Sequence, residues 1–246
     1  MSEERLLAAG NVKYVPGPLK AAIMQPHYLP WAGYFRLAAA ADVFVLLDDV
    51  QSVRPSWQNR NRILSGGKPA WLTVPLVHTQ EFRLIRETGI SDEHPWRARH
   101  AKAVANAYDR HPFFEDAVAA IEPTSDLSLT RLADLNERLF RHIASALGIA
   151  TRLVRSSELA APGERTGRLI AICEALGATH YISPPGSAEY LAQDAFTARS
   201  SIELSFNEFD PPVYPQAGSR EFVSHLSIVD AIANLGFSGA GRYVTG

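Results

Sequence analysis

The sequence predicts an α/β fold with a mostly parallel sheet, flanked by helices and carrying a helical insertion. Short apolar runs rich in β-branched and aromatic residues alternate with helical patterns, as in successive β-α-β units. Several of these runs have no polar face, which is typical of strands that are covered on both sides. We therefore expect a single domain over residues 1–246, with the helical insertion at about 94–148.

Five apolar runs predict the strands of this sheet, at residues 21–25, 43–47, 70–77, 151–155 and 179–183. A helical pattern at 31–41 separates the first two runs. Another at 164–177 precedes the last run and ends in Gly177, a residue suited to a left-handed helix C-cap. Two crossover helices are therefore expected to pack on the sheet.

The insertion predicts two helices, at 96–111 and 128–148, separated by the turn-forming segment "EPTSD". Ser128 is a candidate cap of the second helix, whose apolar face is formed by Leu129, Leu132, Leu135 and Leu139. A closing amphipathic helix is expected at 225–236. The Pro- and Gly-rich ends, "VPGPLK" and "FSGAGRYVTG", have the composition of tails.

Composition narrows the class of protein. Hydrophobic residues make up 46% of the chain and charged residues 20%, which favours a packed core over disorder. The formal net charge of -2 disfavours nucleic acid as the main partner. Cys173 is the sole cysteine, the N-terminal residues lack the layout of a secretory signal, and no apolar run is long enough to cross a bilayer. We expect a cytoplasmic protein without membrane contact.

Unusual polar and aromatic residues follow the predicted strands. The first strand leads into "QPHYLPW" (25–31), the second into "DDVQ" (48–51) and the last into "PPGS" (184–187). The carboxyl ends of parallel strands share one edge of a sheet, where ligands collect. Pro30 suits a first helical turn whose free N–H groups could receive an anion. We expect the three clusters to line one pocket.

The segment "SWQNRNRIL" (56–64) predicts a charged binding surface. In an extended conformation, Gln58, Arg60 and Arg62 lie on one face, and Trp57, Asn59, Asn61 and Ile63 on the other. The planar guanidinium suits phosphate or carboxylate, so the substrate is expected to carry an anionic group. The equally weighted alternative is an edge strand whose arginines form structural ion pairs with Asp48 or Asp49.

His27 and Asp49 are the expected catalytic residues, because a carboxylate near an imidazole can set its tautomer and raise its pKa. Asp49 is preferred over Asp48 from strand alternation alone. The two aspartates could instead cap a turn or bind Mg²⁺. Cys173 is expected in the core. The predicted substrate-binding set is Gln25, Tyr28, Trp31, Asp48, Gln51, Gln58, Asn59, Arg60, Asn61, Arg62, Ser183 and Ser187.

Several blocks together resemble the WbqC-like protein family. They are "MQPHYLPWAGYF", "DVFVLLDDVQ", "SWQNRNRIL" and "WLTVPL", followed in the same order by "LADLNERL", "YISPPGSAEYL", "YPQ" and "LSIVDAIANLG". The match runs from Lys20 to Gly236. One departure is Pro184-Pro185, where the family more often has a glycine directly after the serine. The resemblance implies a role in O-antigen, other surface-polysaccharide or natural-product biosynthesis.

The fold class expected from these features is Rossmann-like. The nucleotidyltransferase-like superfamily is a fold-level analogy, because it too opens with a strand, a histidine-containing turn and a helix, although no HxGH pattern follows here. Familiar motifs such as HExxH, CxxC, GxSxG, the P-loop and GxGxxG do not occur, so no cofactor and no metal site is assigned.

The leading functional hypothesis is a transferase acting on an activated small molecule, either free or attached to a carrier. The reaction would form an amide or ester, or would transfer a nucleotidyl group. The alternative is a non-catalytic ligand-binding or assembly protein of a biosynthetic cluster. A tRNA-dependent aminoacyltransferase is disfavoured, because its basic patch would rest on few residues: Arg54, Arg60, Arg62 and Lys68. The sequence does not indicate an oligomeric state.

Overall fold

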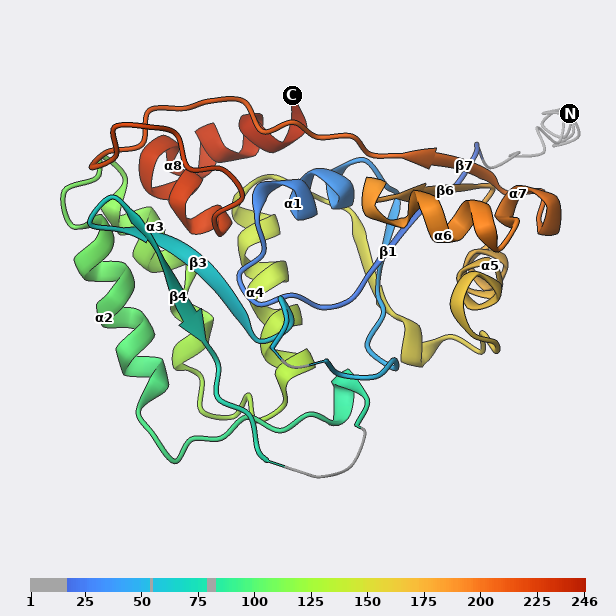
Figure 1. Cartoon of the computed structure of the whole chain (residues 1–246), viewed down its shortest axis with the longest axis horizontal. Helices are drawn as coiled ribbons and strands as arrows, with labels where there is room; N and C mark the ends of the chain where they lie inside the picture. The colour runs from blue at the N-terminus through green and yellow to red at the C-terminus, as the bar shows by residue number, and fades with distance from the viewer. Residues whose placement is uncertain (1–16, 54, 79–82) are drawn as a thin grey trace, which may run out of the picture.

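A parallel sheet forms the centre of the molecule in this computed structural model, which describes residues 17–53, 55–78 and 83–246. The sheet has five strands in the order β5-β2-β1-β6-β7, and every neighbouring pair is parallel (Figure 1). The strands are β1 (Lys20–Met24), β2 (Val43–Leu46), β5 (Arg152–Arg155), β6 (His180–Ser183) and β7 (Glu203–Phe206). The expected α/β, Rossmann-like fold is therefore confirmed.

Two separate apolar cores cover the two faces of the sheet. Alternate side chains of the central strands point to opposite faces, so Ala22, Phe44 and Leu46 enter one core while Ile23 and Val45 enter the other. The first core packs against α1 (Ala32–Ala39), α4 (Leu132–Ala146) and α8 (Ile228–Thr245). The second packs against α5 (Arg165–Leu176), α6 (Ala188–Gln193) and α7 (Phe196–Arg199). This double burial is the reason that the strands lack a polar face.

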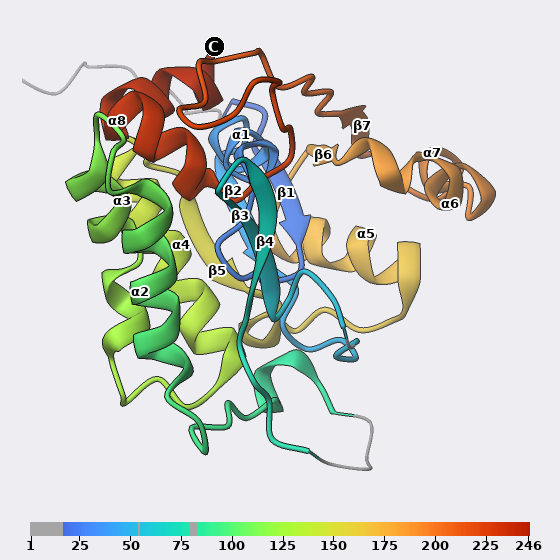
Figure 2. The same ribbon diagram turned by 60° about the vertical axis from the view of Figure 1, so that its left-hand side comes forward.

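The expected strand at 70–77 lies outside the main sheet. Part of it forms β4 (Lys68–Thr73), which pairs antiparallel with β3 (Arg60–Ser65) in a separate hairpin. Gly66 and Gly67 both have positive φ, 58° and 74°, as a tight two-residue hairpin turn requires. The hairpin stands between α2 (Trp96–Tyr108) and the sheet (Figure 2). The apolar run correctly indicated a strand, but the glycine pair directs it to a local partner.

One strand of the sheet is absent from the sequence prediction. β7 pairs with β6 at the edge of the sheet, and its burial is only partial. Its residues, Glu203 to Phe206, alternate polar and apolar side chains instead of forming an apolar run. An edge strand covered mainly on one face gives a weaker sequence signal than a central strand.

The helical insertion contains three helices instead of the two expected. They are α2 (Trp96–Tyr108), α3 (Phe114–Ala120) and α4. Ser128 does not cap α4, because its hydroxyl donates to Asp126 at 2.6 Å and the helix begins four residues later. The start is set by tertiary pairing, since the Leu132 amide donates to the carbonyl of Thr88.

The C-terminal segment expected to be a tail is helical. α8 continues through Gly236, where the backbone is non-helical with φ 71°, and ends at Thr245. Ala240 and Val244 are fully buried, so the second half of α8 belongs to the core. Gly241 allows the close approach, because a Cβ there would lie 2.6 Å from the Leu147 carbonyl oxygen. Of the "VPGPLK" end, residues 15 and 16 lie outside the described residues, and Lys20 already belongs to β1.

A buried carboxylate anchors the segment that precedes α8. Asp230 has no exposed surface and accepts hydrogen bonds from the hydroxyls of Tyr214 and Tyr108, at 2.6 and 3.2 Å, and from the amide of Gln216 at 2.8 Å. Burial raises the pKa of this carboxyl, and the three donors oppose that rise. The contacts hold the "YPQ" segment against α8 and so locate the intervening loop, which contains His225.

Three other sequence predictions agree with the structure, and the expected place of Pro30 in a first helical turn does not. α5 ends at Leu176, and Gly177 is its left-handed C-cap with φ 67°. Cys173 is fully buried in the second core, and burial raises the pKa of its thiol to about 12. The Leu132, Leu135 and Leu139 face of α4 is buried. Pro30 lies before the N-cap of α1 instead of in its first turn, and its carbonyl accepts the Ile228 amide at 2.9 Å.

Aromatic stacking joins the sheet to two helices in the first core. The Phe140 ring of α4 stacks on Phe35 of α1 and on Phe44 of β2, with both centroid separations 5.3 Å. Tyr34 meets Phe140 and Phe44 edge-on. The Phe140 ring therefore fills the space where sheet, α1 and α4 meet.

We predict that Phe140→Ala lowers the free energy of unfolding by about 3–5 kcal/mol, because it leaves a cavity between three elements. Urea denaturation followed by circular dichroism measures the change. Leu127→Ala is the control, since the side chain of Leu127 is 72% exposed and its removal should cost less than about 0.5 kcal/mol. Equal losses in the two variants would contradict this account of the core.

Candidate functional site at the carboxyl edge of the sheet

The loops after all five strands begin at one edge of the sheet, because every strand pair is parallel. The chain passes from β1 through α1 to β2 on one side of β1, and from β5 through α5 to β6 on the other. The direction of winding therefore reverses between β1 and β6. In open α/β sheets this is the position of the ligand-binding crevice.

A cavity of about 170 Å³ lies beyond the end of β1. Its lining comes from three distant parts of the chain: the loop after β1, the start of the hairpin and the loop before α8. The lining residues are His27, Trp31, Trp57, Asn61 and His225. The ring of His225 packs on that of Trp31 with a centroid distance of 4.6 Å. We call this space the His27 cavity.

Amide side chains hold the loop after β1 in place. Gln58 donates from Nε2 to Oε1 of Gln25 at 2.9 Å, and its own Oε1 accepts from the Ser52 hydroxyl and the Val53 amide. Asn61 donates to the backbone carbonyls of Tyr28 and Leu29, at 3.2 and 2.7 Å. Asn61 thus satisfies loop carbonyls that no regular secondary structure would pair, while Gln58 holds the side chain of Gln25.

Asn136 of α4 completes this attachment. Its Nδ2 donates to the backbone carbonyls of Pro26 and Gln58, at 3.2 and 2.8 Å, so one side chain links the loop after β1 to the hairpin. The residue is almost fully buried on the leucine-rich face of α4. The sequence signal for this linking role was the presence of a polar residue, Asn136, on the apolar face of a predicted helix.

The imidazole of His27 is uncharged at neutral pH. Burial lowers its pKa from 6.5 to about 4, and the Tyr34 ring lies 5.2 Å away. A neighbouring carboxylate was expected to raise the pKa of His27. The pKa is lowered instead, so the expected direction of the shift is wrong. Among the described residues the imidazole nitrogens form no side-chain hydrogen bond, and they are therefore available to a ligand.

A second cavity, of about 240 Å³, continues from the His27 cavity along the edge of the sheet. The two share Trp31 and His225, and the second is also lined by Pro184 and Pro185 after β6 and by Asn207 after β7. The loops after β1, β6 and β7 are thus brought together. Asp48 and Asp49, after β2, line neither of these cavities.

Asp48 and Asp49 turn toward β5. Asp48 is buried and accepts from the Ser157 hydroxyl at 2.8 Å and from its amide at 3.1 Å. Asp49 accepts from the Ser156 hydroxyl at 2.5 Å and pairs with the guanidinium of Arg168. Both carboxylates join β2 to β5, its other neighbour in the sheet. The described residues show no contact between His27 and Asp49.

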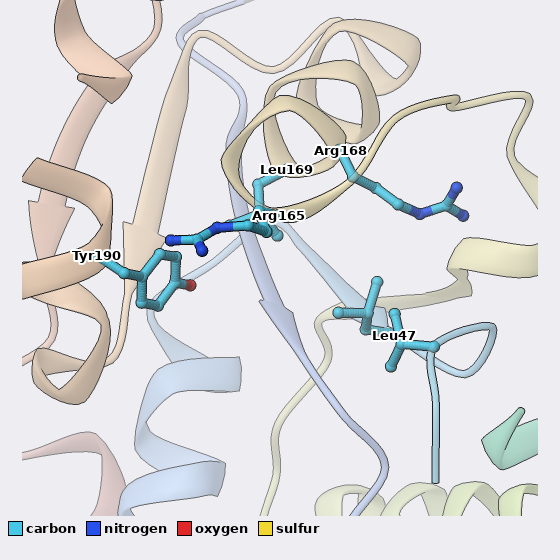
Figure 3. A pocket seen from close by; sticks show the side chains of 6 residues that line it. Leu47, Arg165, Arg168, Leu169 and Tyr190 are labelled. Atoms are coloured by element: carbon cyan, nitrogen blue, oxygen red, sulfur yellow. The ribbon is translucent and has the colours of Figure 1, made fainter. Parts of the chain in front are cut away.

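A third cavity, of about 430 Å³, lies on the α5 side of the sheet. Arg168 lines it, and Asp49 is connected to it through the ion pair with Arg168. Leu47, Val50, Leu169 and Tyr190 supply its apolar walls, and Arg165 and Arg168 supply its charges. Figure 3 shows Arg165 reaching toward Tyr190 while Arg168 extends to the opposite side. Asp194 binds the Arg165 guanidinium through both oxygens, each at 3.1 Å, so both arginines of this cavity are paired with carboxylates.

Arg60 and Arg62 stack on tryptophans at the surface of the hairpin. The Arg60 guanidinium carbon lies 4.2 Å from the Trp71 ring centroid, and that of Arg62 lies 5.7 Å from both Trp57 and Trp71. Trp57 therefore lies on the arginine side, not with the asparagines as alternation predicted, because a turn precedes β3. Asp48 and Asp49 pair with Arg155 and Arg168, so the expected alternative ion pairs do not form.

Five other predicted binding residues have internal hydrogen bonds or lie elsewhere. Tyr28 has no exposed surface, and its hydroxyl bonds to His100 at 2.8 Å. Ser183 is fully buried and shares a 2.5 Å hydrogen bond with Ser187. Asn59 donates to the Val74 carbonyl at 3.1 Å. Gln51 is exposed and pairs through its backbone with Leu84. Arg54 lies outside the described residues.

Two residues that line the His27 cavity, Trp57 and His225, are outside the predicted binding set, and His225 carried no sequence signal. It lies near the end of the chain in a loop, and its backbone is left-handed with φ 58°. A non-glycine residue in this conformation is uncommon and often marks a functional loop. Two backbone hydrogen bonds fix its surroundings, from Ser227 to Arg62 and from Ile228 to Pro30. Only this tertiary closure brings residue 225 next to residues 27 and 31.

Fold and geometry together define an α/β protein with ligand-sized cavities at the carboxyl edge of a parallel sheet. The model of the WbqC-like protein family matches residues 25–240, and the chain belongs to that family. It is 35% identical over 220 residues to the Mycobacterium tuberculosis protein named "Uncharacterized protein Rv1507c", covering 88% of this chain and 94% of that protein. No solved structure matches the chain.

Two further classes of feature are absent from the described part of the chain. None of its helices combines the length and the apolar character that a membrane span requires. No group of three or more histidine, cysteine, aspartate or glutamate side chains in residues 17–53, 55–78 and 83–246 is arranged to hold a metal ion.

We predict that stability falls as the pH is lowered from about 6.5 to 4, partly because of His27 and His100. Burial lowers the pKa of each to about 4 in the folded state. Between these pH values the unfolded chain binds more protons than the folded one, so acid favours unfolding, by on the order of 2 kcal/mol per histidine. Chemical denaturation at a series of pH values measures the slope.

The variant His27→Asn should reduce this pH dependence, because it removes one of the two buried imidazoles. His94→Asn is the matched control, since His94 is exposed and its loss should leave the slope unchanged. An unaltered slope in the His27→Asn protein would show that His27 titrates normally.

Proposed function

We propose that this protein is a biosynthetic transferase that moves a group from an activated small molecule to an amine or hydroxyl acceptor. The observation that carries the proposal is the His27 cavity, in which a neutral imidazole with unengaged nitrogens faces a small aromatic space. The family supports a setting in surface-polysaccharide or natural-product biosynthesis, and the composition supports a cytoplasmic location. The reaction is amide- or ester-forming, or of the nucleotidyl type.

His27 is the proposed proton acceptor. In an acyl transfer, the acceptor nitrogen or oxygen forms a bond to the donor carbonyl carbon, and the bond from that carbon to the leaving group breaks. The acceptor proton passes to the imidazole and then to the leaving group. In the free protein the lowered pKa keeps the imidazole unprotonated, as a base requires. An anionic group bound beside it would raise its pKa and strengthen it as a base.

The volumes of the cavities support a small transferred group. The His27 cavity, at about 170 Å³, is well below the roughly 300–1,000 Å³ that encloses a whole drug-sized ligand. The transferred group or the acceptor fits inside, and the remainder of an activated donor must lie outside. Arg60 and Arg62, on the hairpin that carries Asn61, are the proposed contacts for its anionic part. The second cavity is available for the other substrate.

Asp49 is proposed to act through Arg168 and not through direct contact with His27. Its carboxylate aligns the guanidinium at the rim of the cavity on the α5 side. Asp48 has a positioning role, because its hydrogen bonds hold the end of β2 against Ser157. Gln25 and Gln58 hold the loop that carries His27. Of the remaining members of the predicted binding set, Trp31 and Asn61 line the His27 cavity.

We predict that His27→Asn lowers the turnover number about 10²–10⁴-fold while the fold is retained, because a positioned general base contributes about that much. Substrates are first sought by thermal shift with acyl-coenzyme A esters, nucleotide sugars, nucleotides and aminoacyl adenylates. A ligand at ~100 times its dissociation constant should add roughly 2.7 kcal/mol of stability. Turnover is then measured with the donor that stabilises the protein and a panel of amine and hydroxyl acceptors.

His94→Asn serves as the matched control and should retain wild-type turnover, because His94 is exposed and outside every cavity described above. Turnover within a few-fold of wild type in the His27→Asn protein would exclude His27 as the base. Ligand binding without any turnover would instead favour a non-catalytic binding protein of a biosynthetic cluster.

A further inference from the structure

The exposed face of the hairpin carries two tryptophans and two arginines in mutual contact. The Trp57 and Trp71 rings lie with centroids 5.5 Å apart, and Arg60 and Arg62 pack on them. Trp57 is 43% exposed and Trp71 is 47% exposed, an unusual placement for the largest apolar side chain. We call these four residues the Trp/Arg surface. Exposed apolar patches of this kind mark interaction sites.

The two arginines are not neutralised. Among the described residues neither forms an ion pair, and the Nε of Arg62 is buried without a hydrogen-bond partner. The Nη2 of Arg62 donates a long hydrogen bond, 3.5 Å, to the carbonyl of His225. In contrast, both arginines of the cavity on the α5 side are paired with carboxylates. Within residues 17–53, 55–78 and 83–246, no carboxylate therefore serves as a counterion for the charge on the hairpin.

Stacking leaves the arginines able to bind an anion. A guanidinium that packs on an indole uses its flat face, while its N–H donors point outward in the plane. Planar donor forks match the oxygens of a phosphate. The exposed indoles supply a stacking platform for a planar ring. Phosphate and aromatic ring together are the chemistry of a nucleotide.

The Trp/Arg surface adjoins the His27 cavity. Trp57 belongs to both, and Asn61, between the two arginines in sequence, lines the cavity from β3. The Arg62 guanidinium contacts the carbonyl of His225, which also lines the cavity. A ligand held by its phosphates at Arg60 and Arg62 would lie at the mouth of the small cavity. The cavity would receive whatever group the nucleotide carries.

We propose that the Trp/Arg surface binds the nucleotide portion of a nucleotide-activated small molecule, with the base stacked on indole and the phosphates on Arg60 and Arg62. The biological role of this binding rests on the proposed transferase function, because the nucleotide would be the activating group of the donor. Binding itself is independent of turnover. A free nucleotide is the occupant, not a nucleic-acid strand, in keeping with the net charge of -2.

Tryptophan fluorescence tests the proposal directly, because Trp57 and Trp71 are two of the four tryptophans and both are exposed. The full chain is titrated at low ionic strength with ATP and UTP, with adenosine and uridine, with pyrophosphate and with a single-stranded oligothymidylate. We expect saturable quenching by the nucleoside triphosphates. The nucleosides should bind about tenfold more weakly or worse, because they lack the phosphates. Pyrophosphate should compete with the triphosphates for the two arginines, although it has no ring to stack on the indoles.

Variants assign the binding to the surface. Arg60→Gln and Arg62→Gln should each weaken triphosphate binding about tenfold or more, measured by calorimetry. Arg60→Lys should also bind more weakly than wild type, because the charge remains but the planar fork is lost. Trp71→Ala should reduce the preference for triphosphate over pyrophosphate, since it removes the platform. Arg110→Gln is the control. It replaces an exposed arginine that follows the end of α2, and it should bind like wild type.

Circular dichroism melting of each variant separates a folding defect from lost binding. Failure of both triphosphates to bind would overturn the proposal, as would equal loss in Arg110→Gln. Tight binding of the oligothymidylate without binding of mononucleotides would overturn it in favour of a nucleic-acid surface. The His27→Asn variant should keep nucleotide binding, so loss of turnover there with retained binding tests the transferase function alone.

Discussion

The attachment of the loop after β1 to the hairpin and to α4 is the constraint on which the candidate site depends. Pro26, Tyr28 and Leu29 offer backbone carbonyls that lie outside any ladder, and the amides of Asn61 and Asn136 satisfy them. Leu29 has a positive φ of 42°, an unfavourable conformation for leucine that these contacts maintain. The position of His27 between these carbonyls therefore results from side-chain amides contributed by two other elements.

Charge is distributed differently on the two sides of this loop. On the β5 side, Arg155 pairs with Asp134 of α4 at 2.8 Å, and it also pairs with Glu137. Asp49 and Arg168 likewise neutralise each other, so these groups hold the loops after β2 and β5 together. On the hairpin side, Arg60 and Arg62 pack on indole rings, and neither forms an ion pair with a described residue. The first arrangement is structural in character, and the second leaves charge available to a ligand.

The C-terminal segment closes the site from the far end of the chain. Asp230 gathers Tyr108, Tyr214 and Gln216, and the loop that follows returns across the start of α1. The backbone of Trp31 pairs there with that of Ser227. His225 reaches the cavity because these contacts hold its loop against the start of α1. The blocks "YPQ" and "LSIVDAIANLG" thus act together in space, which their separation in sequence does not reveal.

The amino-acid sequence by itself determined the α/β class, the positions of β1, β2, β5 and β6 and the location of polar residues after those strands, because each depends on local patterns of apolar residues and turns. It also indicated His27, Trp31 and Asn61 as site residues, and all three line one cavity. The tertiary structure alone decided which other residues these side chains contact. Asp48 and Asp49 could face either neighbour of β2, and strand order turned them to β5. Ser128 lost its expected role as a cap because Thr88 pairs with the start of α4, and His225 entered the site through pairing across nearly the whole chain. Such choices rest on long-range contacts, which no local pattern encodes.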